Sequence, residues 1–268
     1  MADTARGAIL TDRHRRRQVA FATASDSRIR RTWRLLDLAD IDGTRAVWNA
    51  TTVNEIAGRY MVSRHLAEQY LAAYRTVELG AVTGGTVLPG LDRATWSAVL
   101  DAVGPQALKR QIGAGVPPRL AYETVRGQVV AEARKMIMSG GRGTVRESAR
   151  QDSRAVGWRR VSDGDPCTFC AMLVSRGPAY TSEALALTKG GTDDPYHRNC
   201  GCTVEVIYGD WQPTEAEQVF VDAYFDAAEA ADAADEPRTA GTVLWRMREG
   251  GTFTDSPARR AIERAARP

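Results

Sequence analysis

The sequence predicts a predominantly α-helical α+β protein, in which a helical N-terminal region precedes a small β module and a helical C-terminal tail. Three observations lead to this prediction. Apolar residues recur at three- and four-residue steps through most of the chain before Gly157, as they do in amphipathic helices. All four cysteines lie between Cys167 and Cys202, and the segments on either side of them have the composition of strands. Alanine-rich helical patterns return after Pro213.

These patterns divide the chain into four expected segments. Residues 1–34 form a basic N-terminal arm or a frayed helix. Residues 35–156 form a helical domain, and residues 157–209 form a small β module around the cysteines. Residues 210–268 form an acidic helix followed by a basic helical tail.

The helical domain is expected to contain one long helix. It runs from Thr44 to Leu79, because its apolar residues keep helical spacing and Gly80 supplies a C-cap. The turn signal Asp42-Gly43 precedes it.

A second helix is expected to open at Pro117-Pro118, since proline is favoured in the first turn. We expect it to end near Met138, because residues 139–143 read Ser-Gly-Gly-Arg-Gly and glycine disfavours the helix interior. A separate helical piece is then expected over residues 144–155.

The two strand candidates are residues 157–161 and 203–208, which bracket the cysteines. Beyond Pro213 an acidic, alanine-rich helix is expected, mostly with a solvated acidic face. Two short helical patterns, separated by Gly250-Gly251, follow it.

Charge is distributed unevenly along the chain, although the formal net charge is only +3. Residues 1–34 hold nine arginines against three acids, whereas residues 210–236 hold nine acids and no lysine or arginine. An arginine-rich arm gains affinity for phosphates by releasing counterions, without reading sequence. We therefore expect non-specific DNA contact from the basic segment, with a solvated or scaffold-binding helix as the alternative. The candidate residues are Arg13, Arg15, Arg16 and Arg17.

The sequence lacks the patterns typical of membrane-spanning and secreted proteins and of several enzyme classes. No run approaches the roughly 18 apolar residues of a membrane-spanning helix, and the start, MADTARGAIL, lacks the apolar region of a secretory signal. We expect no membrane contact and synthesis in the cytoplasm. The Walker A, G-x-S-x-G and G-x-G-x-x-G motifs are missing. A Ser-His-Asp triad would need His14 or His65 as its base, so we predict no catalytic residue and a non-enzymatic protein.

The cysteines and one histidine have the spacing of a metal site, C-x2-C-x26-H-x2-C-x-C. Zn²⁺ prefers four nitrogen or sulfur ligands in a tetrahedron, and C-x2-C lets two thiolates of one turn reach the same ion. The sequence therefore predicts a structural zinc knuckle whose metal stabilises a module too small for a large core. Either the histidine joins three cysteines or all four cysteines bind. The candidate ligands, four of which would bind the zinc, are Cys167, Cys170, His197, Cys200 and Cys202.

Other interpretations of these residues stay open. Buried free cysteines and a redox pair are two of them. Another is a zinc-dependent nucleic-acid enzyme, because Pro166-Cys167-Thr-Phe-Cys170 matches half of the zinc deaminase signature and His197-Arg-Asn199 faintly matches a nuclease motif. The deaminase H-x-E and a second nuclease histidine are missing, however. A zinc-ribbon DNA-binding protein is the remaining alternative.

The segments GWRRVSDGDPCTFCAMLVSRGPAY (157–180) and YHRNCGCTV (196–204) resemble the Mu F-like minor head proteins of tailed bacteriophages, in particular the actinobacteriophage members. The shared pattern is a strand, C-x2-C, an aliphatic turn, H-x2-C-x-C and a second strand. Family members often have proline where this chain has Arg198.

The resemblance implies a minor capsid protein of the virion that associates with the portal and the capsid interior. It would act in head assembly and in DNA packaging or delivery. The implied partners are the portal protein, the major capsid or scaffold protein and packaged DNA. Some members are labelled maturation proteases, but the residues of this chain do not support that label.

Overall fold

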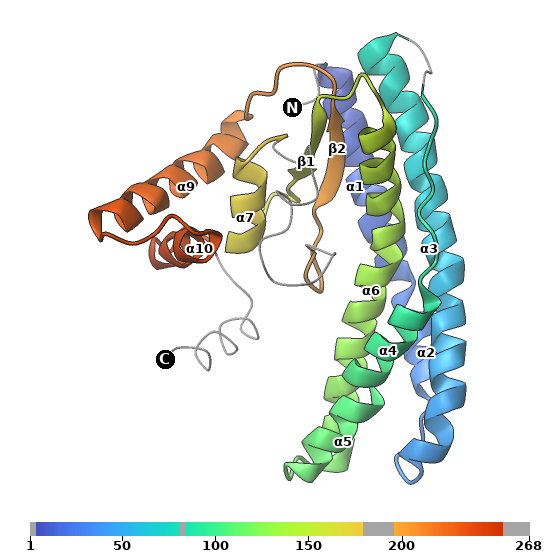
Figure 1. Cartoon of the computed structure of the whole chain (residues 1–268). Coiled ribbons are helices and arrows are strands. Elements are labelled where there is room, and N and C mark those ends of the chain that lie inside the picture. Colours follow the sequence, from blue (N-terminus) through green and yellow to red (C-terminus); the bar gives the residue numbers. More distant parts are fainter. Residues whose placement is uncertain (1–3, 81–83, 179–195, 254–268) are drawn as a thin grey trace. The chain divides into compact units, whose positions relative to one another are not determined.

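A computed structural model describes residues 4–80, 84–178 and 196–253 of the chain (Figure 1). Helices make up most of the described residues, and two short strands form one sheet. The predicted class, a predominantly helical α+β protein, is confirmed. None of the helices in the described ranges combines the length and the apolar character that crossing a membrane requires.

The chain folds into two compact units. The helical unit comprises Leu10–Ser148 and Tyr196–Cys200. The mixed unit comprises the described residues within Met1–Ile9, Ala149–Pro195 and Gly201–Pro268. The four-part division predicted from the sequence stays a prediction.

Long helices that lie side by side form the body of the helical unit (Figure 1). Its core is aromatic and aliphatic, and the rings of Trp33 and Trp48 meet edge to face at 5.3 Å. The helices are α1 (Ala5–Ala24), α2 (Asp26–Trp33), α3 (Ile41–Leu79), α4 (Arg93–Val103), α5 (Pro105–Gly113) and α6 (Pro118–Gln151). The start of α1 and the end of α6 belong to the mixed unit.

The long predicted helix is α3, and its two ends follow from local signals. The Asp40 side chain caps the N-terminus by accepting a hydrogen bond of 2.9 Å from the Gly43 N–H. Gly80 ends the helix in the left-handed region, at φ 70°, where a residue without Cβ is not strained. The helix starts three residues before the predicted Thr44 and ends at the predicted Leu79.

The predicted helix break at residues 139–143 is wrong, because α6 continues through them to Gln151. The glycines there allow close approach between helices. A Cβ on Gly140 would lie 2.6 Å from the backbone oxygen of Tyr60 in α3, and a Cβ on Gly143 would lie 3.0 Å from Pro89. Neighbouring segments therefore pack against the glycine backbone, and tertiary contact outweighs the low helix propensity of glycine.

Residues 5–33, which lie in the segment expected as a basic arm or a frayed helix, form the two packed helices α1 and α2. A polar junction joins α1 to α3 and α6. Gln18 donates to the Ser63 carbonyl at 2.9 Å and accepts from the Ser63 hydroxyl at 2.7 Å, while the Gly141 N–H donates to that hydroxyl at 2.9 Å. Thr11 on the same face of α1 bonds to the Tyr70 hydroxyl at 2.8 Å. These hydrogen bonds satisfy buried polar groups and fix the segment in place.

The mixed unit is built around a two-stranded antiparallel sheet, which confirms the two strand predictions. The strands are β1 (Gly157–Val161) and β2 (Thr203–Ile207), and their register pairs Gly157 with Ile207 and Val161 with Thr203. The remaining helices of this unit are α7 (Thr168–Ser175), α9 (Glu215–Ala233) and α10 (Ala240–Glu249).

The acidic, alanine-rich helix predicted beyond Pro213 is α9. Thr214 and Glu217 form a reciprocal capping box at its start, which explains why the helix begins there. The first of the two short C-terminal helical patterns is α10. The second falls on residues outside the described ranges.

Candidate metal centre

The C-x2-C pair lies at the start of α7 in the mixed unit. Cys167 is the N-cap residue, with an extended backbone, and Cys170 belongs to the first turn. The Ala171 N–H donates to the Cys167 carbonyl at 2.9 Å and closes this turn. Residues three apart on a helix face the same side, so the turn directs both thiols the same way.

The structure brings the five predicted ligands into two groups that share one residue. The donor atoms of Cys167, Cys170 and His197 all lie within 4.8 Å of one another, and so do those of Cys170, Cys200 and Cys202. Cys170 belongs to both groups. Thiolates and an imidazole at these separations are compatible with a metal site.

The shared ligand lies beside a buried positive charge. Cys170 is buried, and the Nη1 of Arg160, which is also buried, points at its Sγ from 3.4 Å. A guanidinium at this position compensates the negative charge that a thiolate ligand carries. Arg160 comes from β1, so the strand supplies a cation next to the candidate site.

The ring of His197 is oriented for binding through one nitrogen. Its Nδ1 lies 2.7 Å from the carbonyl oxygen of Arg198. Because a carbonyl oxygen only accepts, Nδ1 carries the hydrogen in this contact and Nε2 keeps its lone pair. A backbone carbonyl that fixes the histidine tautomer is typical of metal-binding histidines.

Within the helical unit, side chains of α6 hold the segment Tyr196–Cys200. Arg198 donates from Nε to Glu132 at 2.7 Å, so the residue that departs from the proline of the resembled family makes an ion pair. Arg142 donates from Nη2 to the Cys200 carbonyl at 2.5 Å and lies over the Tyr196 ring, 3.8 Å from its centroid. Sequence reasoning missed Arg142, which is buried and lies among the glycines taken for a helix break.

The C-x-C turn contains one residue with an unusual backbone conformation and one glycine that is close to a neighbouring side chain. Asn199 has φ 61°, which asparagine tolerates better than most residues. At Gly201 a Cβ would overlap the carboxylate of Asp163. The glycine therefore makes room for a neighbouring side chain beside Cys200 and Cys202.

In a comparison with known protein families, the chain matches the VG15 protein family over residues 8–231. The chain belongs to this family. VG15 proteins are phage gene products, so the protein is phage-encoded. The matched range includes all five candidate ligands. No curated protein and no solved structure matches the chain.

In this VG15 protein a buried ion-pair network links both strands to α9. Arg159 of β1 donates from Nε to Glu205 of β2 and from Nη1 to Glu217 of α9, both at 2.6 Å. All three side chains are buried. Burial acts to lower the pKa of Arg159, but the two carboxylates outweigh it and the pKa is raised above its usual value. Sequence reasoning missed this network, because no local pattern connects Arg159 with carboxylates that lie 46 and 58 residues away in the sequence.

The four arginines predicted to contact DNA differ in their surroundings on α1. Arg13, Arg16 and Arg17 are exposed, whereas Arg15 is partly buried and binds Asp12 at 2.8 Å. Arg16 also pairs with Asp12. The exposed face of α1 is therefore basic, and Arg15 contributes least to it.

The two histidines considered as bases lie apart from the candidate metal ligands. His14 is buried and stacks on Tyr70 with ring centroids 4.4 Å apart. Burial, with a smaller effect of Arg17, lowers the pKa of His14 to about 3. His65 is exposed and bonds to Glu68 at 3.2 Å.

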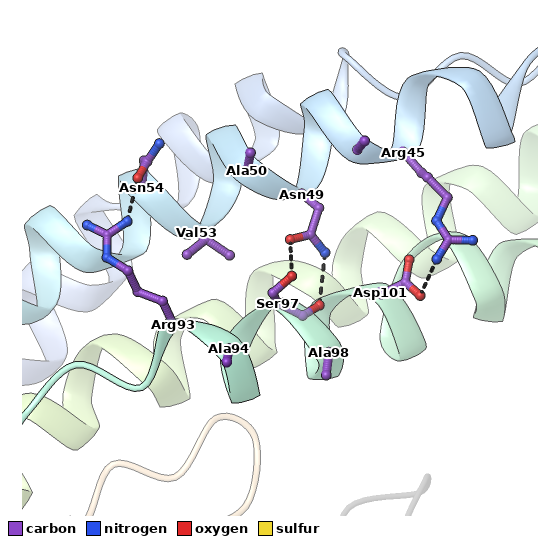
Figure 2. A pocket seen from close by; sticks show the side chains of 11 residues that line it. Arg45, Asn49, Ala50, Val53, Asn54, Arg93, Ala94, Ser97, Ala98 and Asp101 are labelled. Carbon is purple, nitrogen blue, oxygen red and sulfur yellow. Dashed lines mark hydrogen bonds and ion pairs between the residues drawn. The ribbon is translucent and has the colours of Figure 1, made fainter.

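A groove of about 760 Å³ lies between α3 and α4 of the helical unit (Figure 2). Alanines line much of it, and the polar side chains on its rims bond across it. The rim pairs are Arg45–Asp101 at 2.9 Å, Asn49–Ser97 at 2.7 Å and Arg93–Asn54 at 2.5 Å. These side chains bond to one another and so connect α3 with α4. Because their polar groups are already paired, we assign no ligand to the groove.

Proposed function

We propose that this phage-encoded protein is a non-enzymatic minor component of the virion head. It associates with the portal and the capsid interior and acts in head assembly and in DNA packaging or delivery. The observation that carries the proposal is the family match over residues 8–231, which contains both the helices and the cysteine–histidine segments that resemble Mu F-like minor head proteins. Portal protein and major capsid or scaffold protein are the proposed partners.

The metal of the proposed site is Zn²⁺ in a structural role. Its ligands would be four of Cys167, Cys170, His197, Cys200 and Cys202. The donor set supports this assignment, because thiolate and imidazole ligands suit zinc and four of them leave no open position for water. Bound zinc would stabilise a unit whose sheet, within the described residues, has two strands of five residues each. Arg160 would balance thiolate charge, and the Arg198 carbonyl would orient His197.

The exposed arginines of α1 support contact with packaged DNA. Arg13, Arg16 and Arg17 share the solvent face of one helix, so they can approach phosphates together. Such contacts add affinity through counterion release and carry no sequence preference.

The experiment that tests the head assignment is a comparison of wild-type phage with phage carrying a nonsense mutation in this gene. We expect the protein in purified wild-type virions at a few copies per particle, by quantitative mass spectrometry. We expect the mutant to yield fewer filled heads in electron micrographs, with rescue by the gene supplied in trans. Absence of the protein from virions, despite its presence in the lysate, would contradict the proposal. Zinc-dependent DNA cleavage by the purified protein, lost in His197→Ala, would favour a nuclease instead.

A further inference from the structure

The solvent side of α9 carries acidic residues around two large exposed apolar side chains. Val219 is 50% exposed and Phe225 is 57% exposed. The opposite side, with Phe220 and Ala228, is buried. We name this surface the acidic face; it consists of Val219, Asp222, Phe225, Asp226 and Glu229, all of them exposed.

The end of α2 presents the opposite combination in the helical unit. Leu35 is 42% exposed and Leu38 is 38% exposed, directly after a run of exposed arginines. The buried side chains of this segment, Ile29 and Trp33 among them, lie in the core. We name this surface the basic patch; it consists of Arg30, Arg31, Arg34, Leu35 and Leu38.

We propose that the acidic face of one molecule docks on the basic patch of a second copy of the chain. Each surface combines two exposed apolar side chains with three charges of one sign, and the signs are opposite; Asp37, exposed between the two leucines, leaves the basic segment with a net positive charge. Within the described residues, the arginines of the basic patch form no ion pair. Apolar contact supplies affinity, while complementary charge orients the partners and speeds their encounter.

The charge of the whole chain favours this arrangement. The sequence of the helical unit contains 22 lysines and arginines against 13 acids, whereas the sequence of the mixed unit contains 14 against 20. Two copies can therefore attract each other head to tail. Because the two surfaces differ, the contact is heterologous, and repeated contacts of this kind close into a ring or form an open filament.

A second copy fits these surfaces better than DNA does. The acidic face repels phosphates, and the leucines of the basic patch serve no purpose in phosphate contact. The exposed arginines of α1, at positions Arg13, Arg16 and Arg17, provide a separate basic surface beside Ile9, which is 57% exposed. The docking inference is therefore independent of the proposed DNA contact.

Charge reversal of each surface, followed by sedimentation equilibrium of the full-length protein with zinc present, tests the inference. One variant is Arg31→Glu with Arg34→Glu, and the other is Asp222→Arg with Asp226→Arg. We expect concentration-dependent association of the wild type, weaker at high salt. Each variant alone should associate at least about tenfold more weakly, because like charges then face each other. An equimolar mixture of the two variants should associate again.

The matched control is Arg13→Glu with Arg17→Glu, which makes the same charge change on α1. This variant should associate like the wild type, and circular dichroism should show native helix content in all three variants. A wild type that stays monomeric up to millimolar concentration would overturn the inference. Equal weakening by the control, or a mixture that fails to associate, would overturn it as well. A variant that carries all four substitutions restores opposite charges on the two surfaces. If this variant is as compact as the wild type but stays monomeric, docking occurs within one chain and the inference is wrong.

Discussion

The continuous course of α6 predicts opposite effects for the same substitution at two of its glycines. In an open helical position, replacing glycine by alanine stabilises a protein by about 0.5–1 kcal/mol. Gly127 is such a position, because nothing lies within 4 Å of a Cβ built there. At Gly140 the Cβ would lie 2.6 Å from the backbone oxygen of Tyr60 and 3.0 Å from its ring. Neither atom belongs to a flexible side-chain end, so α3 itself must shift.

Overpacking of this kind costs about 1–3 kcal/mol. After the gain in helix propensity is subtracted, Gly140→Ala should lower the free energy of unfolding by up to about 2.5 kcal/mol. Gly127→Ala should raise it by about 0.5–1 kcal/mol. Since 1 kcal/mol shifts the melting temperature of a protein of this size by about 2–4 °C, thermal unfolding followed by circular dichroism will separate the variants. If Gly140→Ala stabilises the protein as much as Gly127→Ala does, α3 and α6 do not approach each other there, and the explanation of the unbroken helix fails.

Three further predictions concern buried polar groups and the metal ligands. Arg159→Met leaves the carboxylates of Glu205 and Glu217 buried without their cation. It should lower the free energy of unfolding, measured with urea at neutral pH, by about 3–5 kcal/mol. An unchanged unfolding midpoint would contradict this. Cys170→Ser removes the donor shared by both ligand groups, so the purified variant should contain less zinc than the wild type, for which we expect one zinc per chain by elemental analysis. One zinc per chain in the variant would contradict this. Burial lowers the pKa of His14 to about 3, so between pH 6.5 and pH 3 the histidine is protonated in the unfolded chain but not in the native state. The free energy of unfolding should therefore fall by about 1.4 kcal/mol for each pH unit as the pH is lowered through this range. His14→Phe should remove this part of the pH dependence and keep the ring contact, and equal pH slopes of urea unfolding in both proteins would refute the assignment.

Features that depend on a few neighbouring residues were predictable from the sequence. The end of α3 at Gly80 follows from one glycine after a periodic run, and both strands follow from short β-rich segments. The five candidate ligands were recognisable because their spacing encodes the turns that collect thiols. In each case the signal itself, a glycine, a β-rich segment or a C-x2-C or H-x2-C-x-C spacing, lies within a few residues.

Features caused by contacts between distant segments were not predictable. Glycines at positions 140, 141 and 143 predict a break when only helix propensity is considered, but they allow segments from elsewhere in the chain to pack closely against α6. Polar residues on α1, such as Gln18, predict a solvated arm until Ser63 is known to lie opposite. A partner far away in the sequence decides the outcome in both cases.

A contact between distant segments also holds two of the candidate metal ligands. Spacing predicts His197 and Cys200 as candidate donors, but it says nothing about what fixes their loop. In the structure that loop is held by α6, through the Glu132–Arg198 ion pair and through Arg142, whose guanidinium binds the Cys200 carbonyl and covers the Tyr196 ring. Arg142 can reach this carbonyl only because α6 stays helical through the surrounding glycines. The helix that the sequence predicts to break is therefore the element that positions two of the candidate ligands.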